Sequence, residues 1–103
     1  LLGYASFAPF RTGPGYAHTA EHSIYLAPQA QGKGYGALLM RSLVESARQQ
    51  GIHSLIAGIS GENTGAISFH ERRGFQMVGR VPEAGRKFER WIDLILMQKI
   101  LSA

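Results

Sequence analysis

The fold is decided by the stretch Ser23-Ile-Tyr-Leu-Ala-Pro-Gln-Ala-Gln-Gly-Lys-Gly-Tyr-Gly-Ala-Leu-Leu-Met40. An apolar strand leads through a short turn into a glycine-rich loop, and the loop opens into an amphipathic helix. Gly32, Gly34 and Gly36 lack the Cβ atoms that would keep an anion away from the backbone. The first N–H groups of a helix have no intrahelical partner, and the helix dipole makes that end partly positive. With the charge of Lys33 added, the stretch predicts a phosphate or pyrophosphate site.

The composition is that of one small globular domain. The chain has 103 residues, of which 45% are hydrophobic and 17% charged, so it can bury one limited core. No apolar run approaches the roughly 20 residues that span a membrane, and the first residues lack the basic start of a signal peptide. Cysteine is absent, which excludes disulfides and cysteine metal ligands. We therefore expect a cytoplasmic protein with no membrane partner.

The formal net charge of +4 favours an acidic partner, either a nucleic acid or a polyphosphate cofactor. Apart from Arg72-Arg73 and Arg86-Lys87, the basic residues are scattered singly. This distribution is typical of a cofactor site with a solvated surface, so we expect no nucleic-acid partner.

Apolar periodicity and turn-forming residues predict seven elements in the order β-β-α-β-α-β-β. They are a strand over 1–9, a strand from Thr19 that Pro28 ends, a helix over Tyr35–Gln50, a strand over Ser54–Ile59, a helix over Gly65–Arg73, a strand over Phe75–Val81 and a strand over Arg86–Gln98. The sequence from Pro82 to Gly85 is predicted as a turn. The order of elements predicts an α/β fold with a mixed sheet.

The side chains of these elements are predicted to share faces as follows. On the second strand, one face carries Glu21, Ser23 and Tyr25, and the other His22, Ile24 and Leu26. The apolar stripe of the first helix consists of Leu39, Leu43 and Ala47, widened by Leu38, Met40 and Val44. One face of the last strand carries Trp91, Asp93, Ile95 and Met97.

Two known phosphate-binding loops fit the glycines poorly. A P-loop needs Ser or Thr after the lysine, but Lys33 is followed by Gly34. The dinucleotide fingerprint G-x-G-x-x-G/A is satisfied from Gly32 to Ala37, and Glu62 follows the next strand. However, residues 27–31 separate the strand from the first glycine, which is wider than a Rossmann turn, so a nicotinamide cofactor stays a weaker alternative.

A third loop type matches in full, because Gln31-Gly-Lys-Gly34-Tyr-Gly36 has the pattern Gln/Arg-x-x-Gly-x-Gly/Ala of the acetyl-CoA-dependent N-acetyltransferases, the GNAT superfamily. Further motifs agree in order along essentially all 103 residues: Tyr16-x-x-Thr19-x-Glu21-x-Ser23-x-Tyr25, Asn63 with His70-Glu-x-x-Gly74-Phe75, and Gly85-x-Lys87-x-x-x-Trp91-x-Asp93. The chain resembles the branch that contains the phosphinothricin and methionine sulfoximine/sulfone N-acetyltransferases.

The resemblance implies a mixed, mostly antiparallel sheet flanked by helices. The family fold begins with a strand, two helices and a strand before the first strand of this chain. We therefore expect residues 1–103 to be the C-terminal part of a GNAT acetyltransferase domain that is truncated at its N-terminus. By analogy we also expect a homodimer, with the long final strand as a candidate interface.

The implied reaction is acetyl transfer from acetyl-CoA to the primary amine of a small amino-acid-like substrate. The family pattern makes Glu21 the general base, although a glutamate at a strand end is more commonly just solvated. His70 stands where many GNAT enzymes carry the tyrosine that protonates the leaving thiolate; packing within its helix, or a contact with Asn63, is the alternative.

The resemblance also assigns binding residues. For acetyl-CoA they are Gln31, Gly32, Lys33, Gly34, Tyr35 and Gly36 around the pyrophosphate, the backbone of Tyr25 and Leu26 along the pantetheine, and Asn63, which is also a helix N-cap. For the amine substrate they are Arg11, Tyr16 and Lys87. The positive charges of Arg11 and Lys87 suit a carboxylate or phosphinate group of the substrate.

The chain departs from the family pattern at two places. Ala66 stands where the family often has a serine, and Ser68 can partly take over that role. Glu89 stands where the family often has a glycine, and this difference leaves the identity of the amine open. The histidines lack metal-ligand spacing, so no metal site is expected. A CoA-binding module without turnover and a protein or ribosomal acetyltransferase remain alternative functions.

Overall fold

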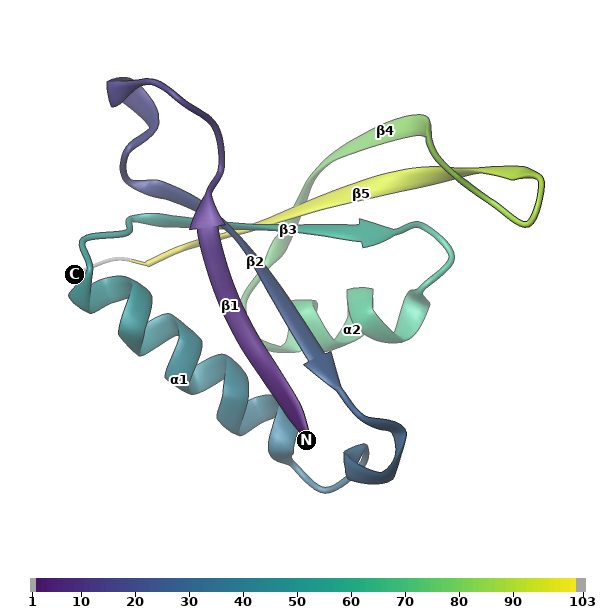
Figure 1. Ribbon diagram of the computed structural model, residues 1–103, viewed down its shortest axis with the longest axis horizontal. Helices are drawn as coiled ribbons and strands as arrows, with labels where there is room; N and C mark the ends of the chain where they lie inside the picture. Colours follow the sequence, from purple (N-terminus) through teal and green to yellow (C-terminus); the bar gives the residue numbers. More distant parts are fainter. Residues whose placement is uncertain (1, 102–103) are drawn as a thin grey trace. The chain divides into compact units, whose positions relative to one another are not determined.

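The computed structural model describes residues 2–101, so the predicted strand start at residue 1 lies outside the described part. The elements are β1 (Gly3–Pro9), β2 (Thr19–Leu26), α1 (Tyr35–Gln49), β3 (Ser54–Ser60), α2 (Thr64–Arg72), β4 (Gln76–Lys87) and β5 (Arg90–Ile100), with single 3-10 turns at Pro14–Tyr16 and Pro28–Ala30 (Figure 1). The strands form one sheet in the order β1-β2-β3-β5-β4. The predicted order of elements and the α/β class are confirmed.

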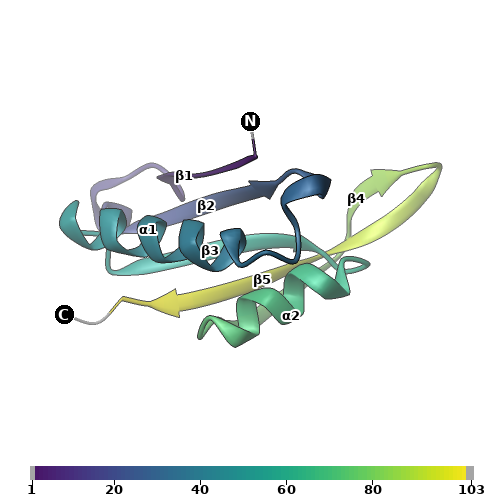
Figure 2. The same ribbon diagram turned by 90° about the horizontal axis from the view of Figure 1, so that it is seen from below.

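The chain divides into two compact units, with the boundary inside β3. Unit 1 runs to Leu55 and includes the segment from Ile100, so it holds β1, β2 and α1. Unit 2 is Ile56–Lys99, which holds α2, β4, most of β3 and nearly all of β5. Figure 2 shows α2 beside the strands of unit 2.

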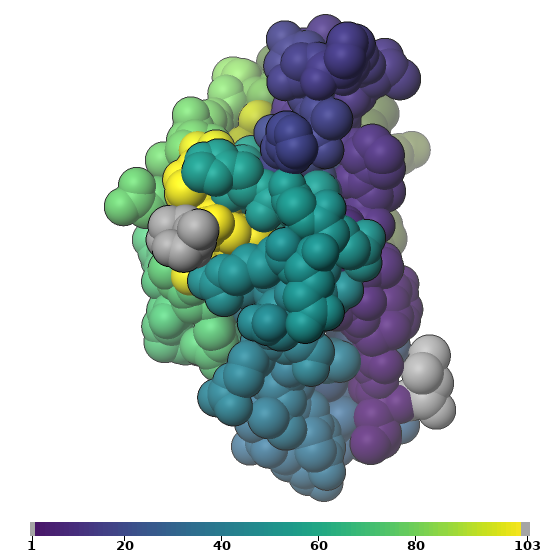
Figure 3. Space-filling view, turned by 90° about the vertical axis from the view of Figure 1, so that its left-hand side faces the viewer, coloured from purple at the N-terminus to yellow at the C-terminus, as the bar shows by residue number. Residues whose placement is uncertain are grey.

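Unit 1 is an antiparallel strand pair with a helix packed on it. β1 and β2 pair from Gly3 opposite Leu26 to Pro9 opposite Ala20, and α1 packs against both strands. Figure 3 shows the surface of α1 beside β1. The predicted alternation of β2 is confirmed, because one face is exposed and the other is buried or half-buried.

The stripe of α1 is confirmed except at Leu38. Met40, Leu43, Val44 and Ala47 are buried, but 55% of Leu38 is exposed. Each helical residue turns the chain by about 100°, so Leu38 lies about 200° around the axis from Met40. The stripe therefore starts one position later than predicted.

The predicted turn over Pro82–Gly85 is wrong. These residues continue β4 through a register shift, since Val81 pairs with Leu94 and Gly85 pairs with Ile92. The tight turn lies further on, at Phe88 and Glu89, whose φ angles are 50° and 62°. Consequently β5 begins at Arg90, not at Arg86.

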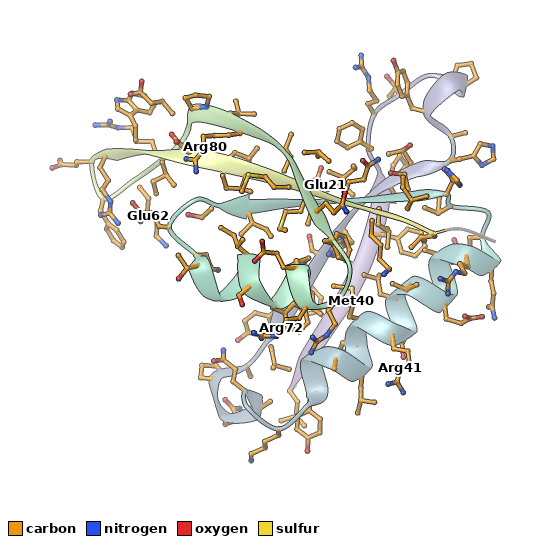
Figure 4. The ribbon with its side chains drawn as sticks, turned by 180° about the vertical axis from the view of Figure 1, so that it is seen from behind. Glu21, Met40, Arg41, Glu62, Arg72 and Arg80 are labelled. Atoms are coloured by element: carbon orange, nitrogen blue, oxygen red, sulfur yellow. The ribbon has the colours of Figure 1, made fainter. Side chains whose placement is uncertain are left out.

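A carboxylate from the opposite strand explains the bulge in β4. Asp93 of β5 accepts a hydrogen bond of 2.9 Å from the backbone N–H of Glu83, which has a φ of 53°, and one of 2.6 Å from Nη1 of Arg80. Figure 4 shows Arg80 on β4. The N–H of Glu83, followed by the charge and hydrogen bond of Arg80, lowers the pKa of Asp93 below its usual range. This partner is ten residues away in sequence, so no local pattern reveals it.

The largest of the fully buried side chains come from β3 and β5. Leu55, Ile95 and Met97 are the largest fully buried residues. On the predicted face of β5, Trp91 is not part of the core, because 56% of it is exposed. The guanidinium of Arg86 lies over its ring, 4.6 Å from the centroid. No helix within residues 2–101 has the length and apolar character to cross a membrane.

We expect Ile95→Ala to lower the free energy of unfolding by about 2–5 kcal/mol, because it leaves a cavity at a fully buried site. The matched control is Ile100→Ala on the same strand, where 50% of the side chain is exposed and the loss should be below about 1 kcal/mol. Urea denaturation of both variants measures the difference. Equal losses would contradict the assignment of Ile95 to the core.

Candidate functional site

The glycine loop of unit 1 has the backbone conformation that only glycine adopts easily. Gly32 and Gly34 have φ angles of 77° and 81°. A Cβ atom at either position would meet nothing within 4 Å. The conformation of the backbone, rather than crowding, therefore explains these two glycines.

The loop leads into an open helix N-terminus. Gly34 is the N-cap of α1 and offers no side chain, the first turn contains no acidic residue, and the first helical hydrogen bond runs from the N–H of Leu38 to the carbonyl of Gly34 at 3.3 Å. The N–H groups of the three residues in between have no intrahelical acceptor. Together with exposed Lys33, this end of α1 can receive an anion.

The loop also brings the end of β2 close to the start of α1. Nε2 of Gln31 donates a hydrogen bond of 3.3 Å to the carbonyl of Leu26. Leu26 and Tyr35 both line a largely apolar cavity of about 230 Å³ in unit 1. Tyr25, the residue before Leu26, is exposed and lies against the ring of Tyr4, with centroids 5.6 Å apart.

Glu21 lies on β2, opposite Ala8 of β1, and is exposed; Figure 4 labels it on the strand. It shares the exposed face with Tyr25, four residues and about 13 Å further along the strand. A carboxylate and the strand end near the glycine loop thus lie on one face.

The loop between β1 and β2 brings two predicted substrate residues together. The guanidinium of Arg11 lies over the ring of Tyr16, 4.7 Å from its centroid. Both side chains are exposed, and a cation on an aromatic face remains able to accept an anionic ligand.

In unit 2, Asn63 is the N-cap of α2, as predicted. Its Oδ1 accepts a hydrogen bond of 3.0 Å from the N–H of Ala66. One residue earlier, Glu62 forms a two-point ion pair with Arg90 at the start of β5, with distances of 3.0 Å to Nε and 2.6 Å to Nη2.

A cavity of about 640 Å³ lies between the β3–α2 turn and the β4–β5 hairpin. Its lining includes Asn63 from the turn and Lys87 from the hairpin, so it brings together two predicted residues that are far apart in sequence. Glu62 and Arg90 also line it, and Figure 4 shows Glu62 at the turn. In the sequence, Glu62 stands out only as the acidic residue of the dinucleotide fingerprint, and no motif singles out Arg90. Their pairing spans 28 residues, which no local pattern signals.

His70 is buried in unit 2, with 4% of its surface exposed. Its Nδ1 donates a hydrogen bond of 2.8 Å to the carbonyl of Ala66, and its ring meets the rings of Phe69 and Phe75 edge-on. Burial, and secondarily the charge of Arg73, lowers the pKa of His70 below its usual value, against the opposing effect of the Ala66 carbonyl. The hydrogen bond to Ala66 within the helix and the two ring contacts fit the packing alternative.

The predicted residues thus fall into two groups, each within one unit. Unit 1 holds Glu21, the glycine loop, the end of β2 and the Arg11–Tyr16 pair; unit 2 holds Asn63, His70 and Lys87. Within residues 2–101, no three His, Asp or Glu side chains gather where they could hold a metal ion.

Comparisons with known proteins find several related acetyltransferases. An L-methionine sulfoximine/L-methionine sulfone acetyltransferase of Pseudomonas aeruginosa is 44% identical over 98 residues, which cover 95% of this chain and 57% of that protein. The crystal structure of a ribosomal-protein-alanine N-acetyltransferase from Brucella melitensis is 45% identical, with a TM-score of 0.91 over 96% of this chain and 61% of its own.

A GNAT superfamily phosphinothricin acetyltransferase from Sinorhizobium meliloti, solved in complex with acetyl-CoA, is 37% identical, with a TM-score of 0.89 over 96% of this chain and 54% of its own. The chain thus spans little more than half the length of the relatives it matches. The acetyltransferase (GNAT) family pattern matches residues 1–75. Through this match and these relatives, the chain belongs to the acetyltransferase (GNAT) family.

Proposed function

We propose that the protein transfers an acetyl group from acetyl-CoA to the primary amine of a small amino-acid-like substrate, of the phosphinothricin or methionine sulfoximine/sulfone type. The observation that carries the proposal is the open, positively charged N-terminus of α1 behind Gln31–Gly36, in a chain 44% identical to an enzyme of that name. An anion-binding helix end suits the pyrophosphate of CoA.

The residues divide the binding of acetyl-CoA between them. The N–H groups from Gly32 to Gly36 hold the pyrophosphate, and Lys33 adds charge. Gln31, whose own N–H is bonded to Pro28, begins the loop and ties it to Leu26. The backbone of Tyr25 and Leu26, at the end of β2, contacts the pantetheine. The N-cap hydrogen bond of Asn63 uses only Oδ1. Its amide NH₂ group therefore remains to contact the cofactor.

The chemistry requires a neutral amine, because an ammonium group has no lone pair for attack. Glu21 takes the proton, directly or through water, and the amine nitrogen forms its bond to the thioester carbon. The carbon–sulfur bond then breaks, and the thiolate takes up a proton. Arg11, Tyr16 and Lys87 bind the acidic group of the substrate.

We assign His70 to the packing of α2 rather than to protonation of the thiolate. An acid at that step needs a proton to give, whereas the bond from Nδ1 to Ala66 and the lowered pKa support a neutral ring. Protonation by His70 remains the competing prediction.

The alternative substrate class is the N-terminal amine of a protein, which is favoured by the 45% identity to the Brucella ribosomal-protein-alanine N-acetyltransferase. A free-thiol assay with acetyl-CoA on the full-length protein separates the possibilities. Release of thiol with amino-acid analogues supports the main proposal, and release only with peptides supports the alternative. Binding of acetyl-CoA without release in either case indicates a regulatory CoA-binding module.

We further propose a cytoplasmic homodimer. Exposed apolar side chains gather on β4 and at the start of β5, namely Met77, Val78, Val81 and Trp91, and β4 ends the strand order, with a free edge. Light scattering at several protein concentrations tests the dimer, and a monomer throughout would contradict it.

Replacing the proposed base is the first test of mechanism. Glu21→Gln should lower kcat by about 10²–10⁴-fold while leaving the KM for acetyl-CoA nearly unchanged. Ser23→Ala, on the same exposed face of β2, is the control and should keep kcat within about twofold. A Glu21→Gln enzyme with a normal rate across pH would remove Glu21 from this role.

A substitution that is unfavourable in left-handed backbone tests the glycine loop. Gly34→Val places a β-branched residue at a φ of 81°, so binding of CoA should weaken by at least about tenfold in calorimetry. Gly15→Ala, where a Cβ meets nothing within 4 Å, should bind normally. Circular dichroism checks that both variants are folded; normal binding by a folded Gly34→Val protein would contradict the site.

The buried state of His70 predicts how stability depends on pH. Its pKa is lower in the folded protein, so the unfolded chain takes up the proton first as the pH falls below about 6.5. The free energy of unfolding should therefore fall from that pH down to the folded pKa. In His70→Gln this fall should be smaller, measured by denaturation at a series of pH values. An unchanged pH profile would show that His70 is not the cause.

A further inference from the structure

The walls of the 640 Å³ cavity in unit 2 are held by backbone and carboxylate contacts. The N–H of Gly61 in the β3–α2 turn donates a hydrogen bond of 2.8 Å to the backbone carbonyl of Asp93. A Cβ at Gly61 would lie only 3.2 Å from that oxygen, so the turn fits closely against β5. The carboxylate of Asp93 meanwhile holds Arg80 and the N–H of Glu83 in β4.

The ion pair of Glu62 with Arg90 joins the same turn to the hairpin. Arg90 pairs directly with Lys87 across the hairpin, and between them lies the left-handed turn of Phe88 and Glu89. Left-handed backbone is unfavourable for residues other than glycine. A contact that fixes Arg90 therefore also fixes the backbone of Lys87.

The charges of the cavity leave Lys87 available. Glu62 lies near enough for the charge of Lys87 to contribute to its lowered pKa, but its two oxygens are bonded to Arg90, which is the larger cause. Among residues 2–101, Lys87 forms no salt bridge, and its ammonium lies 5.3 Å from the centroid of the Phe88 ring. Because both oxygens of Glu62 are bonded to Arg90, this carboxylate does not neutralise Lys87.

We propose that Glu62 and Arg90 are positioning residues that hold Lys87 across the cavity from Asn63 and keep its charge free for the acidic group of the amine substrate. This inference rests on the proposed function, in which Asn63 contacts acetyl-CoA and Lys87 contacts the amine. The pair is about half exposed, and exposed ion pairs contribute little to stability. Its effect is therefore on substrate binding.

The test is the kinetics of Glu62→Gln and Arg90→Gln in the full-length protein, with L-methionine sulfone and phosphinothricin as amines. The KM for the amine should rise about tenfold in Arg90→Gln, which leaves Glu62 free to pair with Lys87, and about threefold in Glu62→Gln, which loses only the positioning of the hairpin. In both variants, kcat and the KM for acetyl-CoA should stay within about twofold of the unsubstituted protein. The thermal midpoint should stay unchanged. The charge exchange Glu62→Arg with Arg90→Glu should recover part of the affinity lost in either single variant, because it restores the ion pair that fixes position 90.

The matched control is Glu45→Gln, which removes the exposed ion pair of Glu45 with Arg48 on α1 and should change no kinetic constant. An unchanged amine KM in Glu62→Gln would overturn the proposal. So would a parallel rise of both KM values with a lower thermal midpoint, since that pattern indicates a structural role alone.

Hydrogen exchange separates this inference from the proposed function. The amides of Lys87 and Phe88 should exchange about tenfold faster in Glu62→Gln than in Glu45→Gln, whether or not an amine is acetylated. Equal exchange rates overturn the positioning role. Failure to acetylate any amine, together with faster exchange in Glu62→Gln, overturns the proposed function. It still supports the role of Glu62 and Arg90 in fixing the hairpin at Lys87.

Discussion

The left-handed backbone at Gly32 and Gly34 is the constraint on which unit 1 depends. It lets the chain leave β2 and enter α1 within a few residues, so that Leu26 and Tyr35 line one cavity. The same conformation leaves the N-terminus of α1 without a side-chain cap. An uncapped helix end is normally satisfied by water or a ligand, so the geometry of the turn and the proposed binding of an anion have one origin.

Carboxylates organise unit 2 in a comparable way. Asp93 closes the bulge of β4, and Glu62 connects the β3–α2 turn to the hairpin. Neither contact is buried enough to contribute much stability. Their value lies in geometry, because they set the shape of the cavity that Asn63 and Lys87 share.

The relatives give these features a chemical context. The proposed acetyl transfer to an acidic amine would use three of them: the helix end suited to pyrophosphate, the exposed carboxylate on the strand before it, and the cavity lined by Lys87. In the proposed reaction, His70 is buried and bonded to Ala66, so the thiolate takes its proton from water or from Glu21.

The sequence alone determined the order of the elements, the glycine loop before α1, the Asn63 cap and the alternation of β2, because each depends on residues within a few positions of one another. Only the tertiary structure decided three others: the bulge where a turn at Pro82–Gly85 was predicted, the pairing of Glu62 with Arg90, and the meeting of Asn63 with Lys87 in one cavity. These depend on partners 10 to 28 residues apart, which strand pairing brings together and a local pattern cannot encode.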